Sequence, residues 1–390
     1  MTQFTYSIPT KVIFGPDKLG TLGKELSKFG KKVLIVYGGG SIKRNGLFDK
    51  VTAQIKEAGM EYFELPGVDP NPKVTSVNAG AEICKKEGID VILAVGGGSV
   101  IDCSKGIAAG AYYDGDAWDF CIGKAKIGKC LPIVSIITIA ATGSEMDAVG
   151  VISNAETEQK LVISHPNLRP AVTYEDPTLT YTVSNYQTAC GSADILSHLM
   201  EDYFLNEDEC MYMLDAVKEG LMKTVVKYAP IALAKPDDYE ARANLMWASS
   251  WAINGFTGAL CTSAWSCHMI EHEISAIYDI THGLGLAIVT PRWMKYVLDE
   301  TTAPKFREWA VNVWGVDASL APMDAAKAGI AALEKWLFQD LGLKSTLTEI
   351  DIDDKNLAVM AKKACGGKDK LYGWRALSPE DITEILRQCL

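Results

Sequence analysis

The sequence predicts two domains, an α/β domain built on a parallel sheet followed by an all-α domain. The first half of the chain alternates short β-branched runs with amphipathic stretches, whereas the second half is a succession of long amphipathic segments. The 390 residues also exceed the length at which one hydrophobic core usually stops growing. We place the boundary near residue 180, so that residues 1–182 form the α/β domain and residues 183–390 the helical domain.

Three strand-and-helix pairs are expected in the first domain, since each short apolar run precedes a segment with helical periodicity. The pairs are Lys32–Tyr37 with Leu47–Ala58, Glu61–Leu65 with Val74–Glu87, and Val91–Val95 with Val100–Ala111. Further short strands are expected at Leu131–Thr138, Gly150–Ile152, Leu161–Ser164 and Ala171–Tyr174. This alternation is typical of βαβ units, which build parallel sheets.

The character of the chain changes after Pro177. From Ser184, which suits a helix N-cap, the segments are long, amphipathic and rich in Ala, Leu, Met, Glu and Lys. Few runs in this half resemble strands. The second domain is therefore predicted to be helical throughout.

The composition favours a globular protein that acts on small molecules. The net charge of −11 and the lack of a long basic run argue against a nucleic-acid partner and an anionic membrane surface. No apolar run approaches the roughly 18 to 20 residues needed to span a bilayer. The ten cysteines are scattered without Cys-x2-Cys pairs, and the N-terminus lacks a signal-peptide pattern. We expect reduced thiols and a cytoplasmic protein.

Two glycine-rich turns resemble each other. Val33–Ile42 and Val91–Val100 each run from a strand into three glycines and a serine before a helix. Backbone amides at such a turn, together with a helix N-terminus, bind phosphate well. Gly96–Ser99, followed by Asp102, is the stronger pyrophosphate candidate in what would be a Rossmann-like domain. Neither turn has the G-x-G-x-x-G pattern, and the alternative is a tight strand-to-helix turn without a ligand.

The position that reads the adenosine ribose carries no carboxylate. An acidic residue after the strand usually accepts from the ribose hydroxyls and repels a 2′-phosphate. Gly38 stands there, and Ser41, Lys43 and Arg44 follow it with a hydroxyl and two positive charges. NADP is therefore favoured over NAD. The alternative is that Lys43 and Arg44 are solvated surface charges.

A hydroxyl-rich segment closes the strand at Leu131–Thr138. It continues through Thr142 to Glu145, and its small residues suit contact with a diphosphate or a nicotinamide ribose. A helix N-cap box is an equal reading of the same residues. Lys160 precedes an apolar run, and its default expectation is solvent exposure.

Four of the five histidines lie between residues 198 and 282. Asp194 and His198 share one helix face, as do His268 and His272, and His282 follows. One carboxylate with three imidazoles suits a divalent metal such as Fe(II) or Zn(II), in a catalytic rather than a structural site. The alternative for each pair is an ordinary helix-packing histidine, and spacing does not choose between His272 and His282.

With these residues assembled, the chain resembles the iron-containing (group III) alcohol dehydrogenases, closest to their butanol dehydrogenase branch. The likeness runs over essentially the full length, and the family has a dehydroquinate synthase-like fold. The motifs are the Gly38–Lys43 turn, Pro70-Asn71-Pro72, Gly96–Asp102, Thr142–Glu145, Gly191-x2-Asp194-x3-His198-x2-Glu201, and the spacing of His268, His272 and His282. Departures are Gly38 in place of an aspartate, Thr138–Thr142 in place of Thr-Thr-x-Gly-Thr, and Met269–Glu271 in place of small residues.

The resemblance implies particular roles. It makes Asp194, His198, His268 and His282 the metal ligands, with His272 lining the reaction site in a cleft between the domains. His272 and Asp102 are assigned as catalytic. The expected cofactor contacts are Gly38, Gly39, Gly40, Ser41, Asn71, Gly97, Gly98, Ser99, Asp102, Thr138, Thr142 and Lys160. A homodimer is also implied, through the region from Thr5 to Phe14.

These assignments predict a metal-dependent, NAD(P)H-linked alcohol dehydrogenase or aldehyde reductase for short- to medium-chain substrates. The metal would hold the substrate oxygen. A polyol or glycerol dehydrogenase of the same superfamily is the alternative, followed by a dehydroquinate synthase-like lyase. A lyase acting on a phosphorylated acid would need clustered Arg and Lys near the ligands, which the stretch from His268 to His282 lacks. A non-catalytic scaffold that binds metal and nucleotide is the rival from another class.

The candidate residues of the substrate pocket are Trp265, Cys267, Phe256 and Asn254, with core packing as their alternative.

Overall fold

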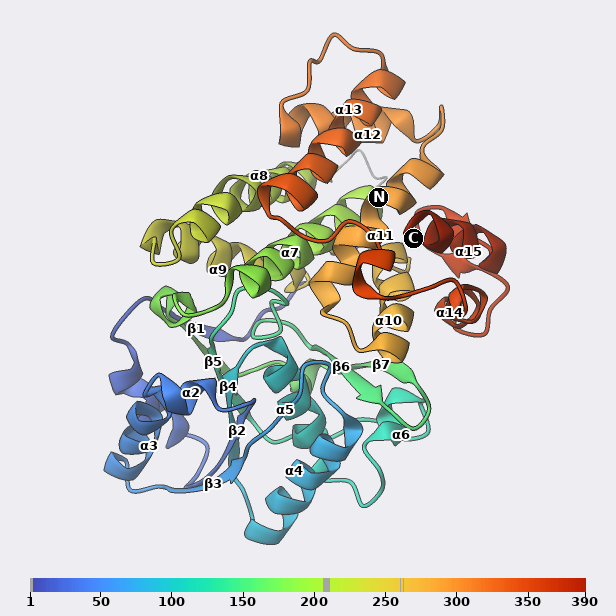
Figure 1. The fold of residues 1–390 in the computed structure, drawn as a ribbon. Helices are drawn as coiled ribbons and strands as arrows, with labels where there is room; N and C mark the ends of the chain where they lie inside the picture. Colours follow the sequence, from blue (N-terminus) through green and yellow to red (C-terminus); the bar gives the residue numbers. More distant parts are fainter. Residues whose placement is uncertain (1–2, 206–210, 260, 262) are drawn as a thin grey trace. The chain divides into compact units, whose positions relative to one another are not determined.

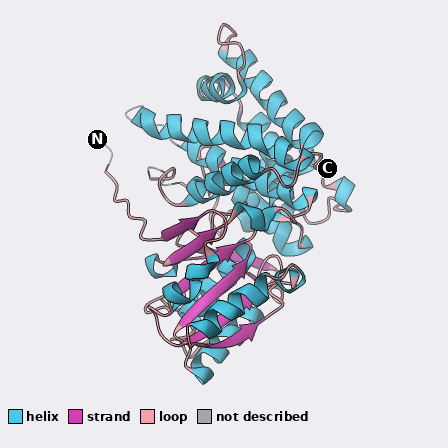
Figure 2. Cartoon of the chain, turned by 90° about the vertical axis from the view of Figure 1, so that its left-hand side faces the viewer, coloured by secondary structure: helices cyan, strands magenta, loops and turns pink. Residues whose placement is uncertain are grey.

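The protein separates into two compact units. The computed structural model describes residues 3–205, 211–259, 261 and 263–390. The α/β unit comprises Ser7–Thr182, and the helical unit comprises Val183–Leu390 together with the N-terminal segment up to Tyr6. Figure 2 shows the long strands gathered in the α/β unit and helices filling the other.

The α/β unit is built on a six-stranded sheet with the order β1-β8-β5-β4-β2-β3 (Figure 1). Every pair of neighbouring strands is parallel. The strands are β1 Lys11–Phe14, β2 Lys32–Tyr37, β3 Glu61–Leu65, β4 Val91–Gly96, β5 Ile133–Ile137 and β8 Val172–Glu175. The parallel sheet predicted from the alternating pattern is confirmed, as is the helical second half.

Helices cover the sheet because its strands are apolar on both faces. Val33 and Ile35 of β2 pack with the helix residues Leu22 and Val51 in one core, while the intervening Leu34 and Val36 are buried on the other face. The helices are α1 Leu22–Leu26, α2 Ser41–Arg44, α3 Leu47–Glu57, α4 Val74–Glu87, α5 Gly98–Gly110 and α6 Trp118–Cys121. A separate antiparallel hairpin is formed by β6 Val149–Asn154 and β7 Gln159–Ser164.

The strand order creates a switch point between β2 and β4. The chain leaves β2 for β3 on one side and then crosses back to β4 on the other side of β2. In open parallel sheets, ligands bind beyond the carboxyl ends of the strands at such a point. Tyr37 of β2 lies opposite Val95 of β4, so the two glycine turns that follow these residues leave the sheet side by side.

The helical unit is organised around α7, whose residues from 188 to 204 are buried on all sides. The long helices are α7 Asn185–Leu205, α8 Tyr212–Ala234, α9 Tyr239–Ile253, α10 Ser266–Tyr278, α11 His282–Val297, α12 Ala303–Trp314, α13 Pro322–Lys335, α14 Leu357–Ala364 and α15 Pro379–Gln388. A short hairpin joins β9 Leu371–Tyr372 to β10 Ala376–Leu377. No helix among the described residues is long and apolar enough to cross a membrane.

Short helical turns complete the two units. In the α/β unit they are Leu19–Thr21, Pro166–Leu168 and Pro177–Thr180, and in the helical unit they are Trp336–Asp340 and Thr348–Ile350. Pro177–Thr180 is the last element before the units divide, and Asp176 caps it by accepting a hydrogen bond from the Thr178 amide. The Asp176 side chain thus fixes the loop in which the sequence analysis places the domain boundary.

A glycine lets α11 approach α7 closely. Gly283 lies in the first turn of α11, and a Cβ built on it would be 2.0 Å from the backbone oxygen of Cys190 on α7. No side chain fits at that distance, so this approach requires glycine. Because His282 precedes Gly283, the same contact brings His282 towards the central helix.

Replacing Gly283 with alanine is expected to destabilise the protein by about 1–3 kcal/mol, the usual cost of overpacking a core. Gly220 in α8 is the matched control, since it is exposed and a Cβ there meets nothing within 4 Å. Gly220→Ala should leave stability unchanged or raise it, because alanine is the better helix former. Denaturant unfolding of both variants checks this, and equal stabilities would contradict the close approach of α11 to α7.

Candidate metal centre and nucleotide-binding turns

Four side chains predicted to bind metal converge in the helical unit. Asp194 and His198 lie on α7, His268 lies on α10, and His282 begins α11. The Nε2 atoms of His198, His268 and His282 lie 3.5, 3.9 and 3.7 Å from Oδ1 of Asp194. The sequence-predicted set is thus brought together from three helices, as Figure 1 allows the reader to follow.

The spacing of these donor atoms suits one shared cation. Separations of 3.5–3.9 Å exceed an ordinary hydrogen bond. Ligand atoms that surround a tetrahedral ion at about 2.1 Å lie roughly 3.4 Å apart. Burial lowers the pKa of His198 well below its usual value, which keeps the ring neutral, the form that ligates metal. One carboxylate and three imidazoles therefore fit Fe(II) or Zn(II).

Two buried glutamates hold the outer nitrogens of the histidines. Glu201 Oε1 lies 2.5 Å from Nδ1 of His268, and the Glu201 carboxylate also accepts from the backbone amides of Cys267 and His268 at 3.0 Å. Glu271 contacts Nδ1 of His282 and accepts from the hydroxyl of Ser275. Each glutamate fixes a ring whose Nε2 turns towards Asp194.

Sequence reasoning gave no role to either glutamate. Glu201 follows His198 by three residues, and Glu271 follows His268 by three, so each shares a helix face with a ligand. That spacing was the available signal. It could not show that each carboxylate serves a histidine on another helix, because this depends on how α7, α10 and α11 pack.

Trp265 forms a wall of the histidine cluster. Its ring centroid lies 5.3 Å from that of His198 and 4.8 Å from that of His268. The indole nitrogen donates to Oδ1 of Asp202 at 3.0 Å, which fixes the ring. Trp265 therefore contacts two of the predicted ligands, and its place in a substrate pocket stays a prediction. Cys267 and Asn254 are fully buried, in line with the core-packing alternative.

His272 lies beside the cluster, one turn along α10 from His268. Its ring centroid is 6.2 Å from that of His268 and 5.4 Å from that of His282. Among the described residues, the ligand atoms of Asp194, His268 and His282 fall within 4.8 Å of one another, whereas His272 groups with Glu271 and His282. This geometry favours His282 over His272 as the ligand to an ion held by Asp194.

In the α/β unit, the second glycine turn lies against a threonine. The helix α5 begins at Gly98, two residues earlier than predicted, so Gly97 and Ser99 stand at its N-terminus. A Cβ on Gly98 would be 2.2 Å from Oγ1 of Thr142. The hydroxyl of Thr142 therefore reaches the turn, next to the amides that are expected to bind phosphate.

The other predicted cofactor contacts are spread along the α/β unit. Thr138 follows β5, and its amide donates to the oxygen of Gly96 at 3.0 Å, which places it beside the second turn. Asn71 is buried and adopts a left-handed backbone conformation with φ 51°. Lys160 lies on β7 and is only 6% exposed, so the default expectation of solvent exposure was wrong. Thr138 thus lies beside the second glycine turn, whereas the contact of Asn71 with the cofactor stays a prediction.

Asp102 belongs to a buried charge network that the sequence did not reveal. Its carboxylate accepts from the Ser144 hydroxyl at 2.5 Å and from the Val151 amide at 3.0 Å. The fully buried Lys105 donates to Ser144 at 2.8 Å and contacts Asp147. Burial raises the pKa of Asp102, an effect that the Lys105 charge opposes. Asp102 thus anchors the segment from 144 to 151 to α5, and its catalytic assignment stays a prediction.

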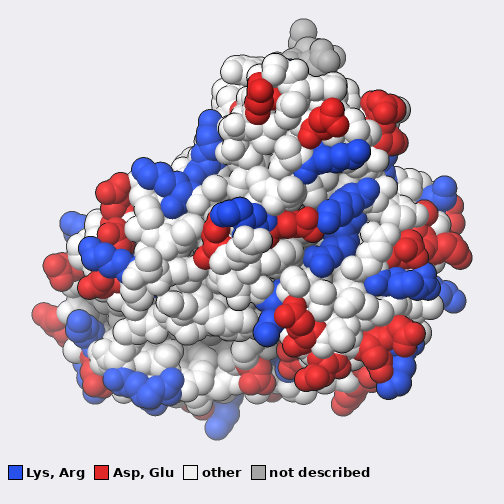
Figure 3. Space-filling view, turned by 45° about the horizontal axis from the view of Figure 1, so that its top comes forward, with Lys and Arg blue, Asp and Glu red and all other residues white. Residues whose placement is uncertain are grey.

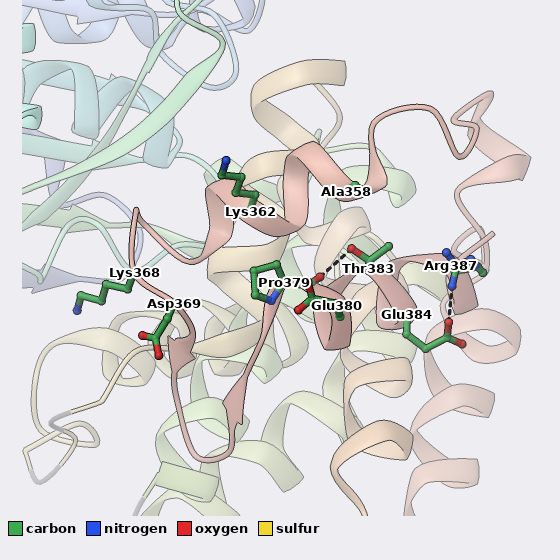
Figure 4. Close-up of a pocket in the computed structure, with 9 residues that line it drawn as sticks. All are labelled: Ala358, Lys362, Lys368, Asp369, Pro379, Glu380, Thr383, Glu384 and Arg387. Carbon is green, nitrogen blue, oxygen red and sulfur yellow. Dashed lines mark hydrogen bonds and ion pairs between the residues drawn. The ribbon is translucent and has the colours of Figure 1, made fainter.

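An open groove of about 680 Å³ lies elsewhere in the helical unit (Figure 4). Its lining includes both basic and acidic side chains, and Arg387 pairs with Glu384 at 2.5 Å. Figure 3 shows the same mixture of charges over one face of the molecule. The groove contains none of the converging histidines, so the chemistry is not expected there.

Comparison with known proteins places these features in a family. Residues 9–177 match the model of the iron-containing alcohol dehydrogenases, and residues 188–390 match the C-terminal model of the Fe-containing alcohol dehydrogenase family. The chain is 51% identical to NADH-dependent butanol dehydrogenase A of Clostridium acetobutylicum over 100% of both chains. It is 33% identical to the NADPH-dependent aldehyde reductase YqhD of Escherichia coli over 93% of each.

A solved structure of a similar protein has the same fold. The crystal structure of NADH-dependent butanol dehydrogenase A from Thermotoga maritima superposes with a TM-score of 0.94, at 39% identity, covering 100% of this chain and 99% of that one. The two family models together span nearly the whole chain, and each covers one of its compact units. This protein therefore belongs to the iron-containing alcohol dehydrogenase family.

Proposed function

We propose that the protein transfers hydride reversibly between NAD(P)H and short- to medium-chain aldehydes such as butanal, with Fe(II) or Zn(II) at Asp194, His198, His268 and His282. The observation that carries the proposal is the convergence of one buried carboxylate and three imidazoles within 3.5–3.9 Å. The similarity to butanol dehydrogenases and to an aldehyde reductase supports the substrate class.

The metal and the nucleotide divide the chemistry. A divalent ion supplies Lewis acidity at the substrate oxygen, where negative charge builds during aldehyde reduction, and the reduced nicotinamide supplies the hydride. Asp194 would be the one charged ligand and would offset one of the two charges of a bound divalent ion. Glu201 and Glu271 keep Nε2 of their histidines turned towards the ion by holding Nδ1.

His272 is proposed as the residue that orients the substrate or moves the proton to its oxygen. It is 6% exposed and lies beside His282, on the helix face that also carries His268. An imidazole carries two ring nitrogens, so it can accept a proton at one and donate a proton from the other. The wall formed by Trp265 excludes water from one side of the ligands.

The dinucleotide is proposed to bind along the carboxyl edge of the sheet. The amides at the start of α5 suit its pyrophosphate, and Gly38–Ser41 would face the adenosine ribose, with Thr138 and Thr142 nearer the nicotinamide. Asn71, Asp102 and Lys160 are further proposed contacts. Gly38 supplies no carboxylate against a 2′-phosphate, so we favour NADP over NAD, although butanol dehydrogenase A of Clostridium acetobutylicum is named NADH-dependent.

Assembly and location follow the same proposal. We propose a homodimer formed through the region from Thr5 to Phe14, because β1 (Lys11–Phe14) is an edge strand that can pair with a second copy. A cytoplasmic location is supported by the cysteines of the described residues, which form no disulfide with one another.

A polyol or glycerol substrate remains the alternative, and a scaffold without catalysis would bind nucleotide and metal yet show no turnover.

Removing one ligand is expected to abolish bound metal and turnover together. His268→Ala and His282→Ala each leave three of the four donors, and a cation that has lost one ligand is held far more weakly. His165→Ala is the control, since His165 lies in the α/β unit and caps a short turn. Metal content by elemental analysis and butanal-dependent oxidation of NAD(P)H check this. A variant that keeps stoichiometric metal and full turnover would refute the ligand assignment.

Glu271→Gln is expected to weaken metal affinity about 10- to 100-fold, because a neutral amide polarises the His282 ring less than a carboxylate does. The change should appear as earlier metal loss in a chelator competition, while the circular dichroism spectrum is unchanged. Glu273→Gln on the same helix is the matched control. The charged residue that acts on Glu273 is Lys363, which is not one of the proposed metal ligands. Equal metal affinities in the two variants would show that Glu271 does not support the ligand.

A further inference from the structure

An ion pair lies beside the first glycine turn. Nζ of Lys43 on α2 is 3.0 Å from Oε2 of Glu64 on β3. The hydroxyl of Tyr37 donates to the same oxygen at 2.7 Å. Glu64 thus receives two donors, and the positive charge near the turn is partly neutralised by a carboxylate that the sequence analysis did not consider.

Aromatic rings hold Lys43 in place. Its Nζ lies 4.4 Å from the ring centroid of Phe48 and 5.1 Å from that of Tyr37. These two rings pack against each other, with centroids 5.5 Å apart. A lysine held over such a platform gains cation–π attraction in addition to its ion pair. Lys43 therefore has a defined position even though its side chain is 48% exposed.

The pair is attached to the turn by backbone contacts. The amide of Gly67, shortly after β3, donates to the oxygen of Gly38 at 3.2 Å, and the amide of Val68 donates to that of Tyr37 at 3.2 Å. The other cation, Arg44, donates to the oxygen of Gly39 at 3.1 Å and so bonds to the turn itself. Both cations that favour a 2′-phosphate already have partners.

We propose that Glu64 is a specificity-determining residue for the nucleotide, because it competes with a 2′-phosphate for Lys43 and repels it. The inference rests on the proposed dinucleotide site at this edge of the sheet. Gly38 carries no carboxylate, so the 2′-position of the ribose is open to both cofactors. Glu64 on the neighbouring strand β3 supplies a negative charge that partly repels a 2′-phosphate. The preference for NADP is thereby smaller than Lys43 and Arg44 alone would produce.

The test is the binding of two nucleotide probes to the full-length protein. Adenosine 2′,5′-bisphosphate carries the distinguishing phosphate, and 5′-AMP lacks it. Glu64→Gln should tighten binding of the bisphosphate about 2- to 5-fold, within the range expected for an exposed charge pair, and leave that of 5′-AMP nearly unchanged. Lys43→Met should weaken the bisphosphate alone. Raising the salt concentration should reduce both effects, since exposed charges are screened.

The control is Glu82→Gln on α4, which removes an exposed glutamate that pairs with Lys85 at 2.9 Å. Titration calorimetry of all four proteins separates the possible outcomes. An unchanged ratio of the two affinities in Glu64→Gln, with both probes bound, overturns the role of Glu64 and leaves the dinucleotide site intact. Binding of neither probe to the wild-type protein overturns the site and the inference together.

Discussion

A buried carboxylate facing three imidazoles is the interaction on which the helical unit depends. Asp194 is 3% exposed, and an ionised carboxylate at such a position is costly unless a cation or strong hydrogen bonds compensate it. Three helices supply the surrounding nitrogens, and Gly283 permits the closest of the helix contacts. Glu201 and Glu271 then fix the rings. The packing of α7, α10 and α11 therefore determines where the metal-binding atoms lie.

The α/β unit meets a different requirement, which is to present backbone amides and hydroxyls at one sheet edge. The crossover from β3 to β4 places the turns after β2 and β4 side by side, and glycine allows close approach at both. The buried Lys105 anchors the segment that follows Thr142, through Ser144 and Asp147. A network that is fully buried and paired in this way gives the edge a single arrangement.

Local pattern was enough to predict much of this arrangement. The three strand-and-helix pairs of the first half follow from apolar periodicity, whereas the short helices α1, α2 and α6 were not predicted. Asp194 and His198 were recognisable because a ligand pair on one helix face has a fixed spacing. The choice of His282 over His272 came from resemblance. Glu271, Lys105 and Glu64 were missed because their partners lie on other elements, so only the packing reveals them. The burial of Lys160 was not predicted either, because it depends on how the hairpin packs, and its role as a cofactor contact stays a prediction.

Hydride transfer to an aldehyde is proposed to need a metal held by the four converging ligands. The most direct measurement is anaerobic oxidation of NADPH and NADH with butanal, on one preparation, before chelation, after it, and after Fe(II) or Zn(II) is returned. We expect turnover that is lost on chelation and restored by metal. Turnover that persists without metal, or its absence in every condition despite nucleotide binding, would contradict this proposal.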